Sequence, residues 1–303
     1  MTATALADRR VDLAILALGV AAVSTAAIFI REAEAPALVI AAYRLTLASG
    51  PLAAFTAVRR RPLLAATTRG NALTLLAGVF LAAHFGFWIA SVQETSIITS
   101  VVLVTAQPLF VALVSGPLLG ERPGPLAWAG IGVAGIGGVV MVGQDIGGGS
   151  DALRGDAFAI LGAVFAAAYI MTGRTMRAGG TDWLPYVTAV YSTSALILVA
   201  VALAAGNAFG GYGRETYLFF ILLALVPQLI GHTAINRSLG YLPAASVAIA
   251  ILGEPVGATL LGVIFLDEDP TPLQLAGGIL VLAGVYLGLR GPITLAEPVV
   301  APD

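Results

Sequence analysis

Residues 252–272 read LGEPVGATLLGVIFLDEDPTP, and the organisation of the whole chain can be read from them. Glu254 and Pro255 stand in the middle of an apolar run that is long enough to span a membrane as a helix. Residues 105–125, TAQPLFVALVSGPLLGERPGP, show the same design. Pro255 follows Pro108 by 147 residues, and further pairs of like residues share that spacing: Glu121 and Glu268, Pro123 and Pro270, Pro125 and Pro272, Gly130 and Gly277, and Gly137 and Gly284. Such an ungapped coincidence of uncommon residues indicates a duplicated unit.

The composition places the chain in a lipid bilayer. Hydrophobic residues make up 58% of the chain, charged residues 11%, and the mean hydropathy is +0.95, whereas soluble domains carry about 25% charged residues. The net charge of −2 and the scattered basic residues argue against a nucleic-acid partner. The lack of cysteine excludes disulfides, thiolate chemistry and cysteine metal sites. We expect the bilayer and a small-molecule substrate as partners, and no cofactor or metal.

The apolar runs predict an all-α polytopic membrane protein with ten transmembrane helices, five in each half. They cover residues 12–30, 36–57, 73–92, 97–119, 125–143, 155–173, 184–205, 217–237, 243–266 and 272–290. We assign residues 1–144 to the first repeat and 145–303 to the second, with a polar linker from Gln144 to Asp156 outside the bilayer. Because five is odd, the second repeat enters the membrane from the opposite side, which gives the inverted repeats of many secondary transporters.

The arginines predict the orientation. With a cytoplasmic N-terminus, eleven of the 15 arginines lie on the cytoplasmic side, whereas Arg31, Arg154 and Arg214 lie outside and Arg44 lies within the second run. Positively charged loops are retained in the cytoplasm, so both termini are expected there. The first run has no cleavage site after a short core and is predicted to be a retained helix. A lysine-free chain rich in Ala and Gly is typical of GC-rich bacterial genomes, so we expect a bacterial inner (plasma) membrane.

Four ionisable side chains lie well inside the apolar runs: Arg44, His84, His232 and Glu254. A buried charge in a membrane costs a few kcal/mol, so each side chain is expected to face the bundle interior or a wet cavity. The two histidines lie nearly at equivalent positions of the two repeats. Gln107 and Glu254 are strictly equivalent, and each precedes a proline that opens its helix, a pattern that indicates a substrate site at the midplane.

Helical spacing predicts two polar faces. His84, Trp88 and Ser91 share one face of the third segment, and Gln228, His232 and Asn236 share one face of the eighth. Tyr43, Tyr169 and Tyr191 add aromatic and hydroxyl groups from other segments.

Each of these positions also has a structural interpretation. The histidines can form neutral hydrogen bonds between helices, Trp88 can pack or face lipid, and Gln107 can cap carbonyls that Pro108 frees. Arg44 is predicted to bind carbonyls or to extend toward the outer surface rather than to contact substrate. Glu254 is the hardest to explain as structure. Its carboxylate favours the neutral form in a low-dielectric cavity unless a cation is near, so it can carry a proton or bind an amine.

Two further features are predicted to be structural. Glu121 and Glu268 fall at helix ends beside proline, where we expect terminal caps or a loop network. Small residues in the fifth and tenth runs let helix backbones approach closely in lipid. The glycines expected to pack in this way, within the chain or at a dimer contact, are Gly130, Gly132, Gly135, Gly137, Gly138, Gly277, Gly278, Gly284 and Gly288.

The repeated motif resembles the EamA family of the drug/metabolite transporter superfamily. It consists of a mid-helix proline, an apolar stretch that ends in Glu beside Gly or Asp, a Pro-x-Pro, and a glycine-rich helix. It runs here from Pro108 through Leu119-Gly120-Glu121-Arg122-Pro123-Gly124-Pro125 to Gly130, and from Pro255 through Leu266-Asp267-Glu268-Asp269-Pro270-Thr271-Pro272 to Gly277-Gly278. The resemblance covers residues 12–290, and the overall likeness is greatest to YddG-type exporters of amino acids and related metabolites.

This resemblance implies ten helices with cytoplasmic ends. It also implies a central cavity lined by the first, third, fourth, sixth, eighth and ninth segments, with the second and seventh as movable walls and the fifth and tenth as a supporting pair. The residues that fall on cavity-forming segments, as candidates for substrate binding, are His84, Trp88, Gln107, Tyr169, Gln228, His232 and Glu254. The candidates for gating or structural roles are Tyr43, Arg44, Tyr191, Asn236, Pro108 and Pro255.

The leading functional hypothesis is a monomeric alternating-access carrier that exports small metabolites, most of all amino acids. Glu254 would receive the ammonium group, amides and imidazoles the carboxylate, and Trp88 with tyrosines the side chain. A polyanion would require several buried cations, and Arg44 is only one.

A second hypothesis is a proton-coupled exporter of lipophilic cations, with Glu254 as the shared site and Trp88 in a cation–π contact. A third is an intramembrane enzyme. Two histidines and a glutamate could bind a metal, but the sequence has no HExxH spacing, serine–lysine pair or cysteine, so we expect no enzyme. A non-transporting receptor or scaffold would have no evident use for polar, kinked helices in inverted halves.

Overall fold

The described part of the chain is almost entirely helical. The structure, a computed structural model, describes residues 3–63, 67–142, 150–266 and 271–295. Its elements in chain order are α1 (Ala3–Val23), α2 (Ala26–Glu32), α3 (Ala37–Val58), α4 (Thr68–Glu94), α5 (Ile97–Val104), α6 (Gln107–Leu119), β1 (Glu121–Pro123), α7 (Pro125–Val142), α8 (Ser150–Ala178), α9 (Trp183–Ala204), α10 (Arg214–Leu223), the π-helix η1 (Ala224–His232), α11 (Thr233–Ser238), α12 (Ala244–Ile251), α13 (Glu254–Leu266), α14 (Pro272–Arg290) and β2 (Ile293–Leu295).

These helices form ten spans that are long and apolar enough to cross a membrane, counted over the described residues. Their limits agree with the predicted runs to within a few residues, so the predicted ten-helix membrane fold is confirmed. The chain is therefore a multi-pass membrane protein.

The predicted linker between the halves is wrong in its second part. Helix α8 already begins at Ser150, and residues 143–149, including the predicted repeat boundary at 144/145, lie outside the described residues. Asp151 in the first turn of α8 favours a helix start, because the N-terminal end of a helix carries partial positive charge. Arg154 on the next turn binds Glu94 at 2.8 Å, an exposed contact between α8 and α4.

Three spans are broken inside the membrane, and two of the breaks are equivalent in the two halves. Helix α5 ends at Val104 and α6 begins at Gln107, and likewise α12 ends at Ile251 and α13 begins at Glu254. A proline, Pro108 or Pro255, follows the break in each case, at a position where a helix needs no backbone N–H. The predicted mid-membrane breaks at these prolines are confirmed. The first span is broken as well, between α1 and α2.

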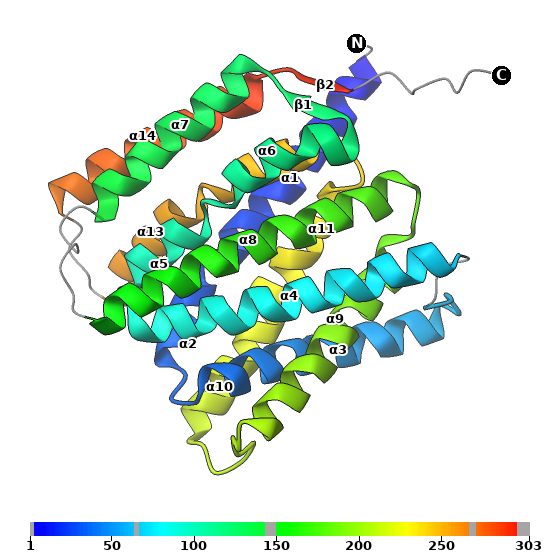
Figure 1. Ribbon diagram of the computed structural model, residues 1–303, viewed down its shortest axis with the longest axis vertical. Coiled ribbons are helices and arrows are strands. Elements are labelled where there is room, and N and C mark those ends of the chain that lie inside the picture. The colour runs from blue at the N-terminus through cyan, green and yellow to red at the C-terminus, as the bar shows by residue number, and fades with distance from the viewer. Residues whose placement is uncertain (1–2, 64–66, 143–149, 267–270, 296–303) are drawn as a thin grey trace.

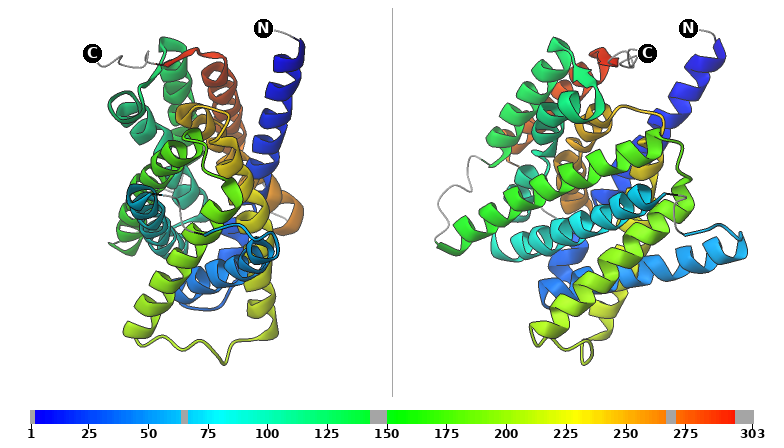
Figure 2. Two further views of the ribbon diagram at one scale, coloured as in Figure 1. Left: turned by 90° about the vertical axis from the view of Figure 1, so that its right-hand side faces the viewer. Right: turned by 45° about the vertical axis from the view of Figure 1, so that its right-hand side comes forward.

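The helices pair across the two halves (Figure 1). Helix α7 packs along α14, α3 along α9, and α4 along α8, while α1 packs against η1 and α11. Each pair consists of one helix from the first half and one from the second, as expected for inverted repeats. Figure 1 shows α7 and α14 along one edge of the molecule and α3, α9 and α10 at the opposite edge. The views in Figure 2 show that the helices cross at different tilts, and that the start of α1 and the end of α14 lie at the same end of the molecule.

Backbone contact holds α7 against α14. A Cβ atom on Gly130 would lie 2.5 Å from Gly288 Cα, and one on Gly137 would lie 2.6 Å from Gly277 O. The predicted packing role of these glycines is confirmed, and the same is true of Gly284, whose Cβ would lie 2.5 Å from Ala134 N. Not every glycine takes part. Gly132 and Gly135 have nothing within 4 Å of their Cβ positions.

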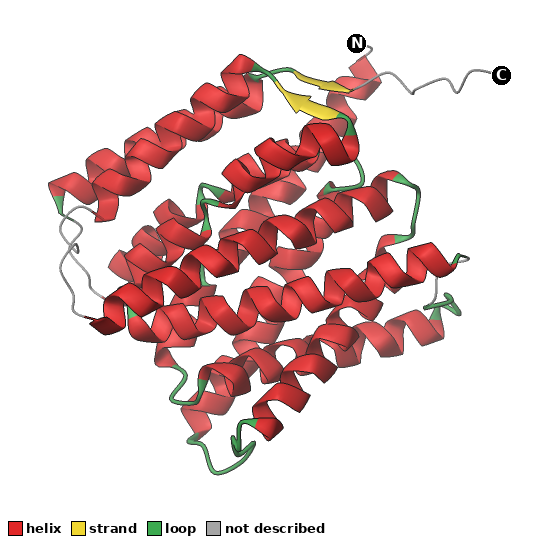
Figure 3. Cartoon of the chain, viewed as in Figure 1, coloured by secondary structure: helices red, strands yellow, loops and turns green. Residues whose placement is uncertain are grey.

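A small antiparallel ribbon joins the segment between α6 and α7 to the segment that follows α14 (Figure 3). Strand β1 pairs with β2, with Glu121 opposite Leu295. The sequence interpretation missed this ribbon, because strands of three residues, one of them with proline, carry no alternating pattern.

Glu121 lies at the centre of a buried polar network beside this ribbon. Its carboxylate accepts a bond from Arg174 Nε at 2.5 Å and one from the backbone N–H of Ala244 at 2.8 Å. Arg174 also donates to Leu239 O at 2.9 Å. Glu121 thereby caps the start of α12 and connects α6 to α8, so its predicted structural role is confirmed. Its counterpart Glu268 lies outside the described residues.

The α7–α14 contact predicts that Gly137→Ala destabilises the protein. The new methyl group would meet backbone atoms that cannot rotate away, which costs about 1–3 kcal/mol of folding free energy. Thermal unfolding in detergent measures the effect, with Gly135→Ala on the open face of α7 as the matched control. The control should unfold at the wild-type temperature or slightly above it. Equal losses in both variants would contradict this assignment of the contact.

The network around Glu121 predicts that Glu121→Gln is also destabilising. Removal of the carboxylate leaves the guanidinium of Arg174 buried and uncompensated, at a cost of about 3–5 kcal/mol. Glu94→Gln is the matched control, because Glu94 pairs with an exposed arginine, Arg154, and exposed pairs contribute little. Chemical denaturation in detergent should separate the two variants clearly. Similar free energies of unfolding for the two variants would show that the buried Glu121–Arg174 pair does not stabilise the fold.

Candidate substrate cavity

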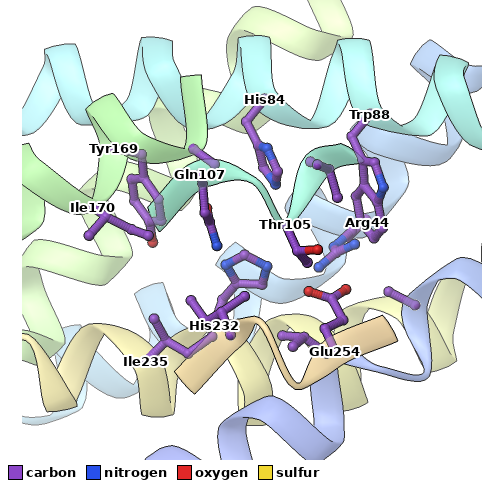
Figure 4. A pocket seen from close by; sticks show the side chains of 15 residues that line it. Arg44, His84, Trp88, Thr105, Gln107, Tyr169, Ile170, His232, Ile235 and Glu254 are labelled. Atoms are coloured by element: carbon purple, nitrogen blue, oxygen red, sulfur yellow. The ribbon is translucent and has the colours of Figure 1, made fainter. Parts of the chain in front are cut away.

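A cavity lies between the broken spans, where both halves of the chain meet (Figure 4). It contains about 510 Å³ of space not filled by protein atoms, its open mouth included. The side chains that line it are Val23, Ala26, Arg44, His84, Trp88, Val104, Thr105, Gln107, Ala166, Tyr169, Ile170, His232, Ile235, Ile251 and Glu254. Six of the seven side chains predicted to bind substrate are among them, and Gln228 is not. Their role in binding remains a prediction.

Helix α4 supplies an imidazole and an indole to the cavity wall. His84 Nδ1 lies 2.9 Å from Gly162 O of α8, and since a carbonyl oxygen only accepts, Nδ1 donates this bond. In a neutral ring the other nitrogen is then an acceptor. His84 therefore joins two helices, as its structural interpretation required, and also points into the cavity. Trp88 stacks on His84 with ring centroids 5.9 Å apart, one helical turn along, and is buried.

The π-helix η1 changes the predicted face of the eighth span. A π-helix bonds each residue to the one five positions on, so a four-residue step no longer completes a turn. The N–H of Thr233 accordingly bonds Gln228 O. The expected common face of Gln228, His232 and Asn236 is therefore wrong for this segment: His232 lines the cavity, while Gln228 is turned toward α3.

The wide turn also accounts for the one-residue offset between the histidines. His232 lies one position beyond the exact equivalent of His84, and η1 has no counterpart in the continuous helix α4. The two imidazoles nevertheless meet, with ring centroids 6.3 Å apart, and Phe85 packs edge-on against His232 at 5.1 Å. Asn236 bonds the hydroxyl of Tyr169 and His232 O at 2.9 Å, which fixes the end of this wall.

Arg44 is fully buried and belongs to the cavity wall. The interpretation that it extends toward the outer surface is wrong, and the carbonyl that it binds is that of the Gln228 side chain. Its Nε donates to Gln228 Oε1 at 2.7 Å, and its guanidinium carbon lies 4.0 Å from the centre of the Phe85 ring. Both terminal nitrogens, Nη1 and Nη2, have no hydrogen-bond partner within the described chain. A position facing the bundle interior was one expectation for Arg44, but the sequence could not identify its polar partner, which is 184 residues away.

Glu254 carries the opposite charge from the other half of the chain. It is the first residue of α13, where the partial positive charge of the helix start favours a carboxylate. It is buried, and no hydrogen bond to its carboxylate occurs among the described residues. Figure 4 shows the carboxylate on the side toward Arg44. No nitrogen of Arg44 comes within 4.0 Å of it, so the two do not form an ion pair here.

Gln107 occupies the equivalent position at the start of α6. Its side chain points into the cavity, and it makes no hydrogen bond to the described part of the protein. The structure therefore does not support the alternative that it caps carbonyls freed by Pro108. Thr105, which the sequence interpretation missed, stands in the break itself and binds the carbonyls of Val101 and Val102 at 2.8 and 3.0 Å.

The remaining candidates lie outside the cavity lining. The Tyr43 ring stacks on Phe220 with centroids 4.4 Å apart, and its hydroxyl bonds Phe209 O near the α9–α10 connection. Tyr191 is fully buried, with its hydroxyl 3.4 Å from Gln228 O. Tyr43 thus packs α3 against α10, and Tyr191 packs α9 against η1. The predicted gating roles of these residues stay predictions.

Comparison with known proteins yields transporters. The EamA-like transporter family model matches residues 11–143 and 153–290. The uncharacterized transporter YxxF of Bacillus subtilis (strain 168) is 22% identical over 221 residues, which cover 71% of this chain and 69% of YxxF. The threonine/homoserine exporter RhtA of Escherichia coli (strain K12) is 29% identical over 203 residues, which cover 66% of this chain and 65% of RhtA. The matches thus span about two thirds of these relatives.

A solved crystal structure of a protein superimposes on the chain with a TM-score of 0.77 at 18% sequence identity, covering 92% of this chain and 96% of that one. At this identity the likeness shows the fold alone. The finer likeness to YddG-type exporters stays a prediction. The two family matches fall one on each half and together cover most of the sequence, in agreement with the ten spans and the paired helix breaks. The chain belongs to the EamA-like transporter family and has the fold of the drug/metabolite transporter superfamily.

Proposed function

We propose that this transporter exports small metabolites, most of all amino acids, by alternating access through the central cavity. The observation that carries the proposal is Glu254, a buried carboxylate without an ion pair in a cavity that both halves line. A carboxylate held in this way suits the ammonium group that all amino acids share. The similarity to RhtA, a threonine/homoserine exporter, supports the same substrate class.

The paired helices support the alternating-access mechanism. Each half contributes one member to every major helix pair, so a tilt that opens one end of the cavity has an equivalent that opens the other. Both termini on the cytoplasmic side, the inner membrane of a bacterium and a monomeric state complete the proposal. The division into repeats at 144/145 is part of it as well. The arginine distribution supports the orientation, and the closure of the cavity within one chain supports the monomer.

The second candidate is a proton-coupled exporter of lipophilic cations. The aromatic wall beside a carboxylate favours it, because such walls attract cations. Arg44 weighs against it. The guanidinium already lies over Phe85 at 4.0 Å and near Trp88 at 6.0 Å, so a cationic substrate would meet a fixed positive charge there. The amino-acid hypothesis does not have this difficulty.

Transport into liposomes tests the proposal directly. We expect purified protein in liposomes to take up labelled threonine, homoserine, leucine or phenylalanine faster than protein-free liposomes. Uptake should proceed down the substrate gradient, and each assay is repeated with an imposed pH gradient. Transport of tetraphenylphosphonium but of no amino acid would replace the proposal by the cation exporter.

Glu254→Gln tests the carboxylate itself. The neutral amide cannot pair with an ammonium group, so the KM for threonine should rise by about tenfold or more, since a hydrogen bond to a charged group contributes about 1.5–3 kcal/mol. Glu215→Gln, at an exposed position in the first turn of α10, is the matched control and should leave the KM unchanged. If wild-type transport instead requires a pH gradient and the variant loses only that requirement, Glu254 is a proton site and not an ammonium site.

A further inference from the structure

The cavity wall holds buried hydrogen-bond donors that the protein leaves unused. Arg44 Nη1 and Nη2 and Trp88 Nε1 are shielded from solvent and have no partner in the described chain. All three are donors only. A buried donor without an acceptor is costly, most of all on a charged group. These donors therefore form part of a binding site for a ligand that supplies a negatively charged hydrogen-bond acceptor.

The geometry of Arg44 specifies that acceptor further. Gln228 occupies Nε at 2.7 Å and Phe85 covers one face of the guanidinium at 4.0 Å, so two contacts fix the plane of the group. The edge formed by Nη1 and Nη2 has no partner in the described chain and can bind a ligand. Two parallel N–H groups on that edge match the two oxygens of a carboxylate, the pairing for which arginine is better suited than lysine.

Charge balance limits the ligand to one that is neutral overall. Arg44 and Glu254 are the charged side chains of the cavity lining, and they come from opposite halves of the chain. They lie near one another without an ion pair. A carboxylate alone would leave Glu254 unmatched, and an amine alone would leave Arg44 unmatched. A zwitterion satisfies both.

We propose that the Nη1–Nη2 edge of Arg44 binds the substrate's carboxylate while Glu254 binds its ammonium group, so that the cavity selects zwitterionic amino acids over amines and amides. This inference rests on the proposed function and assigns the carboxylate to the guanidinium instead of to amides and imidazoles. Arg44 is shielded here, so the complete contact forms when the cavity around it is wider than in this conformation. In so dry a site a charge-assisted pair is strong.

The test compares three ligands that differ at one group. L-Threonine has both charges, L-threoninamide lacks the carboxylate charge, and 1-amino-2-propanol lacks the carboxyl group altogether. Binding to purified protein is measured by calorimetry for the wild type, Arg44→Gln, Arg44→Lys and the matched control Arg154→Gln. Arg154 lies at the exposed start of α8, where it pairs with Glu94.

The wild type should bind threonine about 10- to 100-fold more tightly than the other two ligands, the span expected of a hydrogen bond to a charged group. Arg44→Gln should remove that preference by weakening threonine binding and leaving threoninamide binding within about threefold. Arg44→Lys keeps the positive charge but loses the two parallel N–H groups. Its preference for threonine should lie between those of the wild type and Arg44→Gln. Arg154→Gln should match the wild type.

Equal losses for threonine and threoninamide in Arg44→Gln would overturn the inference and leave Arg44 a purely structural residue, while amino-acid export could still stand. Failure of the wild type to bind or move any amino acid would overturn the proposed function itself. If Arg44→Gln is not monodisperse on size exclusion, the comparison of ligands on the wild type decides. Equal affinity for threonine and its amide then overturns the inference without any variant.

Discussion

Within a bilayer the backbone finds no water, so every N–H and carbonyl group needs a partner inside the protein. This constraint governs where the chain departs from a regular helix. In the described spans the departures fall between α1 and α2, between α5 and α6, along η1, and between α12 and α13. All of them border the cavity, whose lining includes the flanking residues Val23, Ala26, Thr105, Gln107, His232, Ile251 and Glu254. Helices α7 and α14 line no part of the cavity and run unbroken. Irregular backbone is thus concentrated where protein, not lipid, surrounds it.

The scaffold is duplicated, but the two charged side chains that line the cavity are not. Helix pairing follows the repeat throughout, and the breaks at Gln107 and Glu254 coincide in the two halves. Arg44, however, corresponds to Tyr191, and Glu254 corresponds to a neutral amide. A symmetric arrangement of helices suits a carrier that opens to both sides of the membrane. A substrate with one positive and one negative group, however, needs binding side chains of different charge. The shared motif therefore identifies the family, and the side chains that differ between the halves are the ones that we propose to determine specificity.

Much of this could be predicted from the sequence, because the bilayer sets the length of each span and proline marks each break. The ten spans and the inverted repeats followed from the apolar runs and the repeat spacing, and the small residues of the fifth and tenth runs indicated the packing of several glycines. Six of the lining residues were placed by the family resemblance. The failures arise where the local backbone or a distant partner departs from the simple pattern. Gln228 left its expected face because the eighth span contains a π-helix, and Arg44 has its polar partner in the other half of the chain. Strand β1 exists only because β2 reaches it from the other end of the chain.

The contact between α7 and α14 has a mechanical consequence. Where glycine meets glycine, peptide groups touch directly and no side chains lie between them that could change rotamer and absorb a displacement. We therefore expect the two helices to move together, so that a tilt of one half is passed on to the other. Bending during transport must then occur elsewhere in the protein, and we expect it at the broken spans around the cavity. Because α7 contacts α5 and α14 contacts α13, this close-packed pair lies directly beside the broken spans, and we expect movement to be concentrated around the cavity where substrate would bind.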